Sequence, residues 1–431
     1  MSMNFKYLLI VFLYFSILPI SASQALPNHR EIGLDEVREL IQQNRSIIIE
    51  ALNYQISVDN HKQQKSQRMP ILYIDGQGYL SQKRLLYKEA ESSAQLRYQF
   101  NLCSEFDLYT GGRHSSAIKM MEHKQEISQE RLKNVEQKIS LQVYVLLYDI
   151  YCNMKYRDFV RSSIRLREKE YERIDEFYKN GLVLKSDLLR SKLFITDLQK
   201  DEVAIGNSIN ILSDQLCSLL GMEEHTTIIP NLEKNLNHKV HESFDELFQY
   251  ALVHSPHLKM ERIHCKHEKT ALRNIQSSLY PQIKLYANYG IGSPLPYLNF
   301  NHQIGGEIGA KLSFSISSFY QTKNKLRAQE RRIKNQDITL TEEEEKLKNT
   351  LFELYTRYHE SLLNIDRALE KINMSKESMR ILRNSYFNQQ ALLIDVLESE
   401  TQSMKASFEW VEAVVDSQKY YWALKQICGN F

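Results

Sequence analysis

The chain is poor in the residues that interrupt secondary structure. Its 431 residues include 14 glycines and 8 prolines, fewer than an average chain of this length would carry. The five cysteines are scattered and form no Cys-x-x-Cys pair, so neither a disulfide framework nor a zinc site is indicated. The scarcity of glycine and proline favours long, uninterrupted helices.

The chain also has no excess of charge of either sign. Lysine and arginine total 55 against 53 aspartates and glutamates, a formal net charge of +2. A surface that binds nucleic acid normally needs a marked basic excess, so we expect no nucleic-acid partner. Nothing resembles a nucleophile elbow, a phosphate-binding loop or a metalloprotease helix. We therefore expect no enzymatic activity and no cofactor.

Apolar runs long enough to span a membrane are lacking as well. The apolar run at residues 7–18 follows Lys6 and precedes the small residues Ser21-Ala22-Ser23, an order typical of a secretory signal peptide. The run is shorter than the roughly 20 residues of a spanning helix, although a signal anchor is an alternative. We predict that residues 1–23 are a signal peptide and that the mature protein is exported.

The chain does contain an internal repeat of one structural unit. Motifs of the first half reappear 208 to 211 positions later. The matched pairs are Leu34-Asp35-Glu36-Val37 and Phe244-Asp245-Glu246-Leu247, Pro70 and Pro281, Tyr178 and Tyr386, Asp187 and Asp395, Leu189 and Leu397, and Gly221 and Gly429. A steady offset indicates a tandem duplication. We therefore expect a first repeat at residues 24–221, a linker at 222–243 and a second repeat at 244–431.

Each repeat begins with a stretch of helical character, Leu34–Arg68 or Phe244–Leu279, that ends at a proline. Beyond the proline, apolar and polar residues alternate, which predicts strands at about 70–81 and 93–108 and at about 281–292 and 303–317. Strands of this length with one apolar and one polar face suit a transmembrane barrel. A soluble sheet with one covered face is the alternative.

Four strands cannot close a barrel alone, and open sheet edges are too costly in lipid. The barrel interpretation therefore requires several copies of the chain. After the second strand of each repeat come some 65 residues without glycine or proline, which at 1.5 Å per residue make roughly 100 Å of helix. Turns near Asn180-Gly181 and Asn388-Gln389 lead into returning helices with coiled-coil spacing.

This duplicated order resembles the TolC-like outer-membrane efflux protein family, from about Leu34 to Gly429. The resemblance implies a mainly α fold with a β-barrel portion. Three chains form a twelve-stranded outer-membrane β-barrel, continued by an α-helical barrel across the periplasm of a Gram-negative bacterium. It also implies an exit duct for small compounds, served by a periplasmic adaptor and an inner-membrane transporter. The alternatives are the outer-membrane component of a type I protein secretion system and a periplasmic coiled-coil adaptor or scaffold.

The resemblance also implies a gate at the periplasmic tip. It aligns Tyr386 with the gating tyrosine, Asp395 and Glu398 with the carboxylates of the constriction, and Asp187 with the partner aspartate of the first turn. Ala391 stands at the position of the gating arginine, and Gln389 at that of the customary glycine, so the latch is expected to be weaker or built differently. Asp395 and Glu398 share one helix face and could form a carboxylate ring. Ordinary solvated carboxylates at a helix start are the alternative.

Two further groups of residues suggest a metal site and an aromatic girdle. A His-rich segment at residues 254–267 invites a metal-site hypothesis, but its side chains spread along more than two helical turns, so we favour a solvated helix face. Tyrosines near the second pair of strands suit either an aromatic girdle or ordinary sheet packing. The residues are His254, His257, Glu261, His264, Cys265 and His267 in the first group, and Tyr280, Tyr286, Tyr289 and Tyr297 in the second.

Overall fold

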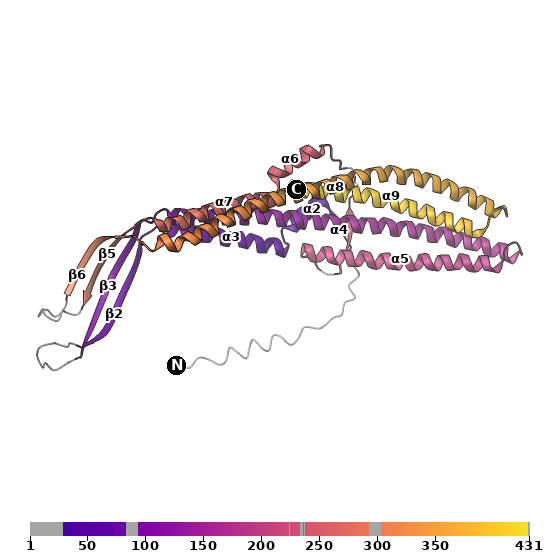
Figure 1. Ribbon diagram of the computed structural model, residues 1–431. Coiled ribbons are helices and arrows are strands. Elements are labelled where there is room, and N and C mark those ends of the chain that lie inside the picture. The colour runs from indigo at the N-terminus through magenta and orange to yellow at the C-terminus, as the bar shows by residue number, and fades with distance from the viewer. Residues whose placement is uncertain are drawn as a thin grey trace, which may run out of the picture.

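The computed structural model is an elongated rod with a sheet at one end and two helical turns at the other (Figure 1). It describes residues 29–82, 94–223, 225–232, 236, 238–292 and 303–429. The predicted signal peptide and Tyr297 lie outside these residues. The elements in chain order are β1 (His29–Gly33), α2 (Leu34–Ile41), α3 (Arg45–Ser66), β2 (Ile71–Gln82), β3 (Ala94–Tyr109), α4 (Arg113–Lys179), α5 (Lys185–Leu220), β4 (Thr227–Asn231), α6 (Phe244–His254), α7 (Pro256–Gln276), η2 (Ser277–Leu279), β5 (Gln282–Gly292), β6 (Gln303–Ser313), α8 (Ser318–Phe387) and α9 (Leu393–Cys428).

The larger sheet has two chemically different faces. Its four antiparallel strands lie in the order β2-β3-β5-β6, so β2 and β6 are the edge strands. The register aligns apolar side chains across the strands, for example Ile74 with Leu102 and Leu102 with Tyr289. These side chains are 77%, 55% and 63% exposed. The other face has polar side chains such as Glu105, which accepts a hydrogen bond from Lys284 at 2.8 Å, and a few apolar ones such as Ile71.

Two very long helices run from the sheet to the far end of the rod. Helix α4 has 67 residues and α8 has 70, so each spans roughly 100 Å at the α-helical rise. Each turns back as a shorter helix of 36 residues, α5 or α9. Helix α4 packs against α3, α5, α7 and α9, and these contacts unite the two repeats. Among the described residues, no helix is long and apolar enough to cross a membrane.

The main hydrophobic core lies at mid-length, where α4 passes α5 and α9. Val143, Leu147 and Tyr148 of α4 are fully buried there. The Tyr144 and Trp422 rings lie 4.6 Å apart, and the indole Nε1 of Trp422 donates a hydrogen bond to the Tyr148 hydroxyl at 3.3 Å. This ring contact and hydrogen bond join α9 to α4 in the core.

The structure corrects the sequence analysis at three places. The opening helix of each repeat is broken in two. Asn44 caps α3 by accepting a hydrogen bond from the Ser46 N–H at 2.8 Å, and Pro256 begins α7, a position that suits proline because no N–H is needed there. Strand β6 ends at Ser313, four residues before the predicted end. The linker contains β4, which pairs in parallel with β1; both strands are too short for alternation to reveal.

Candidate functional site

The candidate site is the tip of the rod, where α4 turns into α5 and α8 turns into α9 (Figure 1). The two turns have the same hydrogen bonds. The Gly181 N–H donates to the Tyr178 carbonyl at 2.9 Å, and the Gln389 N–H donates to the Tyr386 carbonyl at 2.9 Å. Both donors adopt left-handed backbone conformations, with φ of 74° at Gly181 and 62° at Gln389. Glutamine accepts this conformation only at a cost, so the second turn is strained where the first is not.

Apolar packing joins the two turns. Ile174 of α4 lies in one buried cluster with Tyr386, Leu393, Val396 and Leu397 of the second hairpin. Ala391, which stands at the gating-arginine position of the resembled family, packs against this cluster. The Phe177 and Phe387 rings meet edge to face at 6.0 Å. Hydrophobic contacts therefore occupy the place for which the resemblance implies a polar latch.

Of the predicted gate residues, Tyr386 is buried and feels the charge of Asp187. Tyr386 is 8% exposed. Burial, and next the negative charge of Asp187, raise the pKa of Tyr386 to about 12. No described residue hydrogen-bonds to its hydroxyl. Tyr386 therefore stays neutral at physiological pH, with a buried hydroxyl available for a further partner.

Asp395 and Glu398 lie apart from this pair. Both are exposed on α9. The Asp395 carboxylate accepts a hydrogen bond from the Leu392 N–H at 3.3 Å, which stabilises the start of α9. Asp395 therefore has a local structural role within one chain, whether or not it also contributes to a ring.

A buried ionic cluster lies above the turns, and the sequence analysis missed it. Arg167 of α4 pairs with Glu400 of α9 at 2.5 Å, and Arg383 of α8 pairs with Glu170 of α4 at 2.8 Å. Arg167, Glu170 and Glu400 are 4%, 5% and 7% exposed. A pattern could have revealed it: the apolar stripe of α9 runs from Leu397 to Met404, and Glu400 occupies the core position between them.

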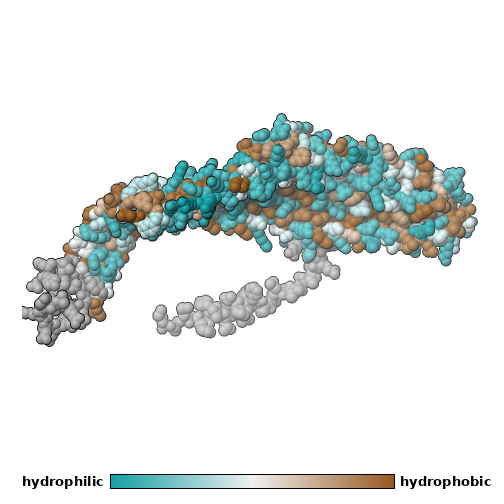
Figure 2. All heavy atoms as spheres, in the orientation of Figure 1, coloured by the Kyte–Doolittle hydropathy of each residue, from teal (hydrophilic) through white to brown (hydrophobic). Residues whose placement is uncertain are grey.

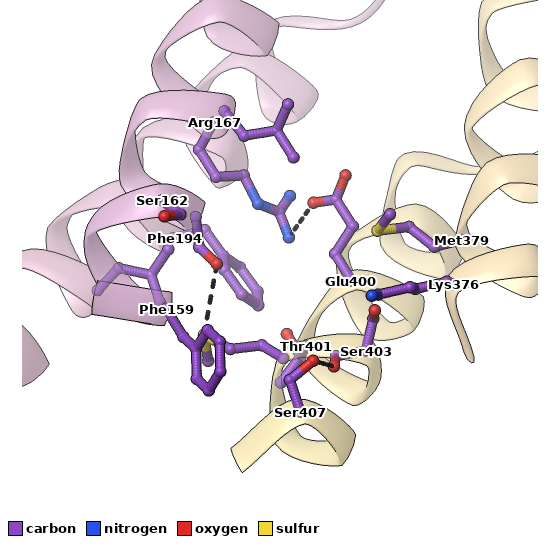
Figure 3. Close-up of a pocket in the computed structure, with 14 residues that line it drawn as sticks. Phe159, Ser162, Arg167, Phe194, Lys376, Met379, Glu400, Thr401, Ser403 and Ser407 are labelled. Atoms are coloured by element: carbon purple, nitrogen blue, oxygen red, sulfur yellow. Dashed lines mark hydrogen bonds and ion pairs between the residues drawn. The ribbon is translucent and has the colours of Figure 1, made fainter. Parts of the chain in front are cut away.

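The cluster borders a cavity of about 280 Å³ between the two hairpins. Figure 3 shows Arg167 and Glu400 pointing toward each other, with Phe159, Phe194 and Met379 around them. The Arg167 guanidinium lies over the Phe194 ring at 4.9 Å, a cation–π contact. Arg167 therefore contacts side chains of both hairpins, Phe194 of α5 and Glu400 of α9.

Burial changes the protonation of this cluster. It raises the pKa of Glu400 to about 7, an effect that the Arg167 charge opposes and the nearby Glu170 carboxylate reinforces. Burial also lowers the pKa of Arg167, although guanidinium groups remain charged in proteins. Glu400 is therefore the acidic group of the tip that can change its charge near neutral pH.

The His-rich segment does not form a compact set of ligands. His254 contacts the Tyr250 carbonyl at 3.0 Å, His257 pairs with Glu343 at 2.9 Å and His267 pairs with Glu268 at 3.5 Å. Within the described parts of the chain, no three His, Cys, Asp or Glu side chains converge on one point. The segment mainly helps to join α7 to α8.

The molecule was compared with known proteins. No protein-family model matches the chain, and no curated protein matches its sequence. Solved structures do match. The outer-membrane channel OprN has a TM-score of 0.79 at 11% identity over 92% of this chain and 90% of that chain. The outer-membrane protein VceC of Vibrio cholerae has a TM-score of 0.78 at 14% identity, over 92% of this chain and 96% of that chain. The MtrE outer-membrane channel of Neisseria gonorrhoeae, in its open state, has a TM-score of 0.75 at 15% identity, over 92% of this chain and 88% of that chain.

Two of these neighbours are outer-membrane channels and the third is an outer-membrane protein, and each overlaps this chain over 92% of its length. This chain has the TolC-like fold, which confirms the expected mainly α chain with a small antiparallel sheet.

The strained turn generates a first prediction. Gln389→Gly should stabilise the tip by about 1 kcal/mol, because glycine adopts the left-handed conformation without steric cost. Gly181→Ala is the matched control and should destabilise by a similar amount, since a Cβ there meets nothing within 4 Å and only the backbone is strained. Hydrogen exchange of the two turns measures both changes. Equal effects of the same sign would contradict the assigned strain.

The ionic cluster generates a second prediction. Arg167→Met should destabilise the packing of α9 on α4 by roughly 3–5 kcal/mol, because it leaves the Glu400 carboxylate buried without its counter-charge. The double variant Arg167→Met/Glu400→Leu should recover most of this loss, since it removes both charges. Hydrogen exchange along residues 396–404 gives the opening free energy. A double variant as unstable as the single one would show that the charges are not coupled.

The protonation of Glu400 generates a third prediction. Its folded pKa of about 7 lies above the ordinary value of 4.5, so the folded state binds the proton more tightly than the unfolded state. This stabilisation is fully present below about pH 4.5 and is lost as pH rises through 7. Relative to Glu400→Gln, wild type should thus be less stable at pH 8 than at pH 5 in denaturant unfolding. If wild type and Glu400→Gln responded to pH in the same way, the buried carboxyl would not be the source of the pH dependence.

Proposed function

We propose that this chain is the outer-membrane exit channel of a tripartite efflux pump. Three copies close one barrel, and the helical rods form a duct across the periplasm. Small compounds are delivered by an inner-membrane transporter and a periplasmic adaptor, and the chain itself conducts them passively without catalysing a reaction. The likeness of the fold to solved outer-membrane channels supports this proposal.

The observation that carries the proposal is the four-stranded sheet. One face exposes apolar side chains such as Ile74 and Ile308, which are 77% and 90% exposed. The opposite face has polar residues, including Asn288, which donates a hydrogen bond to Glu307 at 3.0 Å. Such a sheet fits lipid on one side and a water-filled lumen on the other. Its edge strands β2 and β6 then pair with neighbouring copies.

The tip is proposed to control the passage. Tyr386 lies within the electrostatic influence of Asp187 of the first turn, while the exposed Asp395 and Glu398 are free to face the axis of a trimer. Threefold assembly would place their carboxylates around a narrow passage, which attracts cations and slows anions. The apolar cluster at Ala391 and the ionic cluster at Arg167 hold each chain's two hairpins together.

Conductance in planar lipid bilayers tests the function directly. The purified protein should form cation-selective channels, and Asp395→Asn/Glu398→Gln should reduce that selectivity without abolishing conduction. A protein that inserts but never conducts would contradict the channel function.

Substitution of the lipid-facing side chain generates a fourth prediction. Ile308→Lys should destabilise the inserted protein by about 2–4 kcal/mol, because it places a charge against hydrocarbon. Glu307→Lys, the next residue on the opposite face, should be tolerated, since its side chain faces water. Heat-resistance of the assembled oligomer on gels, after expression in outer membranes, measures the difference. Equal sensitivity of both positions would contradict a sheet with one face in lipid.

A further inference from the structure

The helical segments that border the sheet are unusually basic. They are the end of α3, the start of α4, the end of α7 with η2, and the start of α8. Residues 62–70, 110–121, 271–281 and 317–329 contain nine lysines and arginines and no aspartate or glutamate. The whole chain has almost equal numbers of both signs, 55 and 53. These segments, where the sheet meets the helices, therefore have a local excess of positive charge.

Most of these cations form no ion pair within the described part of the chain. Lys62 pairs with Asp59 at 3.4 Å, and Lys119 pairs with Glu122 at 2.9 Å. The other seven are exposed and form no ion pair with a residue that the structure describes. We call them the cationic collar: Lys65, Arg68, Arg113, Arg273, Lys323, Lys325 and Arg327. Like charges gathered at one level repel one another, so an external anionic partner would relieve this repulsion.

A band of exposed apolar and aromatic side chains separates the collar from the strands. Met69, Tyr280, Phe319 and Tyr320 are 69%, 53%, 57% and 70% exposed. Figure 2 shows hydrophobic side chains gathered where the strands meet the helices, and a hydrophilic surface over the adjoining helices. Aromatic belts mark the boundary between the hydrocarbon and the lipid headgroups. Along α8 the order is thus apolar strand, aromatic band, cationic side chains.

The spacing fits the thickness of a headgroup layer. Lys323 and Arg327 follow Tyr320 by three and seven residues, which is about 5 and 10 Å along a helix. The headgroup region of one leaflet is about 5–8 Å deep, and lysine and arginine side chains extend toward it from the helix. The collar therefore lies at the level of the lipid phosphates if the aromatic band lies at the edge of the hydrocarbon.

We propose that the cationic collar binds the phosphates of anionic glycerophospholipids in the leaflet next to the helical part of the molecule. The collar is supplied by both repeats, so an assembled channel presents cations around its circumference. Bound lipid neutralises them and fixes the height of the barrel in the bilayer. This inference rests on the proposed function, because it requires the sheet to lie in a membrane.

Native mass spectrometry of the full mature protein, released from detergent with phosphatidylglycerol or phosphatidylcholine added, tests the inference. Wild type should retain phosphatidylglycerol preferentially. Each cation near an anionic surface strengthens binding roughly fivefold, so Lys323→Gln/Lys325→Gln/Arg327→Gln should weaken phosphatidylglycerol retention at least about tenfold. The matched control is Arg331→Gln/Arg332→Gln/Lys334→Gln, three exposed cations farther along α8, which should change retention by less than about twofold.

Equal retention of the two lipids by wild type, or an equal loss in both triple variants, would overturn the collar as a lipid site. The same spectra report the number of chains in the particle. A trimer without lipid preference would reject the lipid inference alone. A monomer throughout would reject the proposed channel, and the lipid inference with it.

Discussion

The structure depends on a sheet that one chain cannot complete. Strands β2 and β6 are edges, and each edge presents a row of backbone donors and acceptors that must be paired in a water-free environment. The sheet also exposes apolar side chains on one face and polar ones on the other. Neither water nor lipid alone suits both faces, which supports the proposed assembly with lipid outside, water inside and another copy at each edge.

Because of the duplication, a shorter helix packs along each long helix at both ends of the rod. Near the sheet, α3 and α7 pack along α4 and α8, while beyond mid-length α5 and α9 replace them. The two hairpins meet at the tip through an apolar cluster and a buried ionic cluster. A polar latch between turns is one way to hold a tip closed. This chain instead joins its hairpins by packing around Ala391 and by the Arg167–Glu400 pair, whose strength depends on proton concentration.

Much of the fold could be predicted from the sequence because its patterns are long. Alternation over about ten residues defines β3, β5 and β6, the match of Pro70 with Pro281 in the repeat predicts β2, and the absence of glycine and proline defines α4 and α8. Short elements have too few residues for an alternating pattern to predict them. Strand β4 has five residues, one of them proline. The breaks at Asn44 and Pro256 depend on single capping residues within otherwise helical stretches.

The site was less predictable because burial depends on contacts between repeats. Alignment of the turns predicted Tyr386 and Asp187 as gate residues, and in the structure the Asp187 charge acts on the buried Tyr386 hydroxyl. It could not show that Asp395 caps a helix or that Gln389 adopts a left-handed conformation. Glu400 and Arg167 are 233 residues apart in the chain, and each looks like an ordinary surface charge until α9 is laid on α4.

Single-particle electron microscopy of the mature protein in lipid nanodiscs tests the central claim most directly. The account predicts a threefold particle in which β2 of each chain is hydrogen-bonded to β6 of its neighbour and the apolar sheet face contacts lipid. A monomeric or twofold rod, or a sheet whose edge strands remain unpaired by other copies, would contradict it.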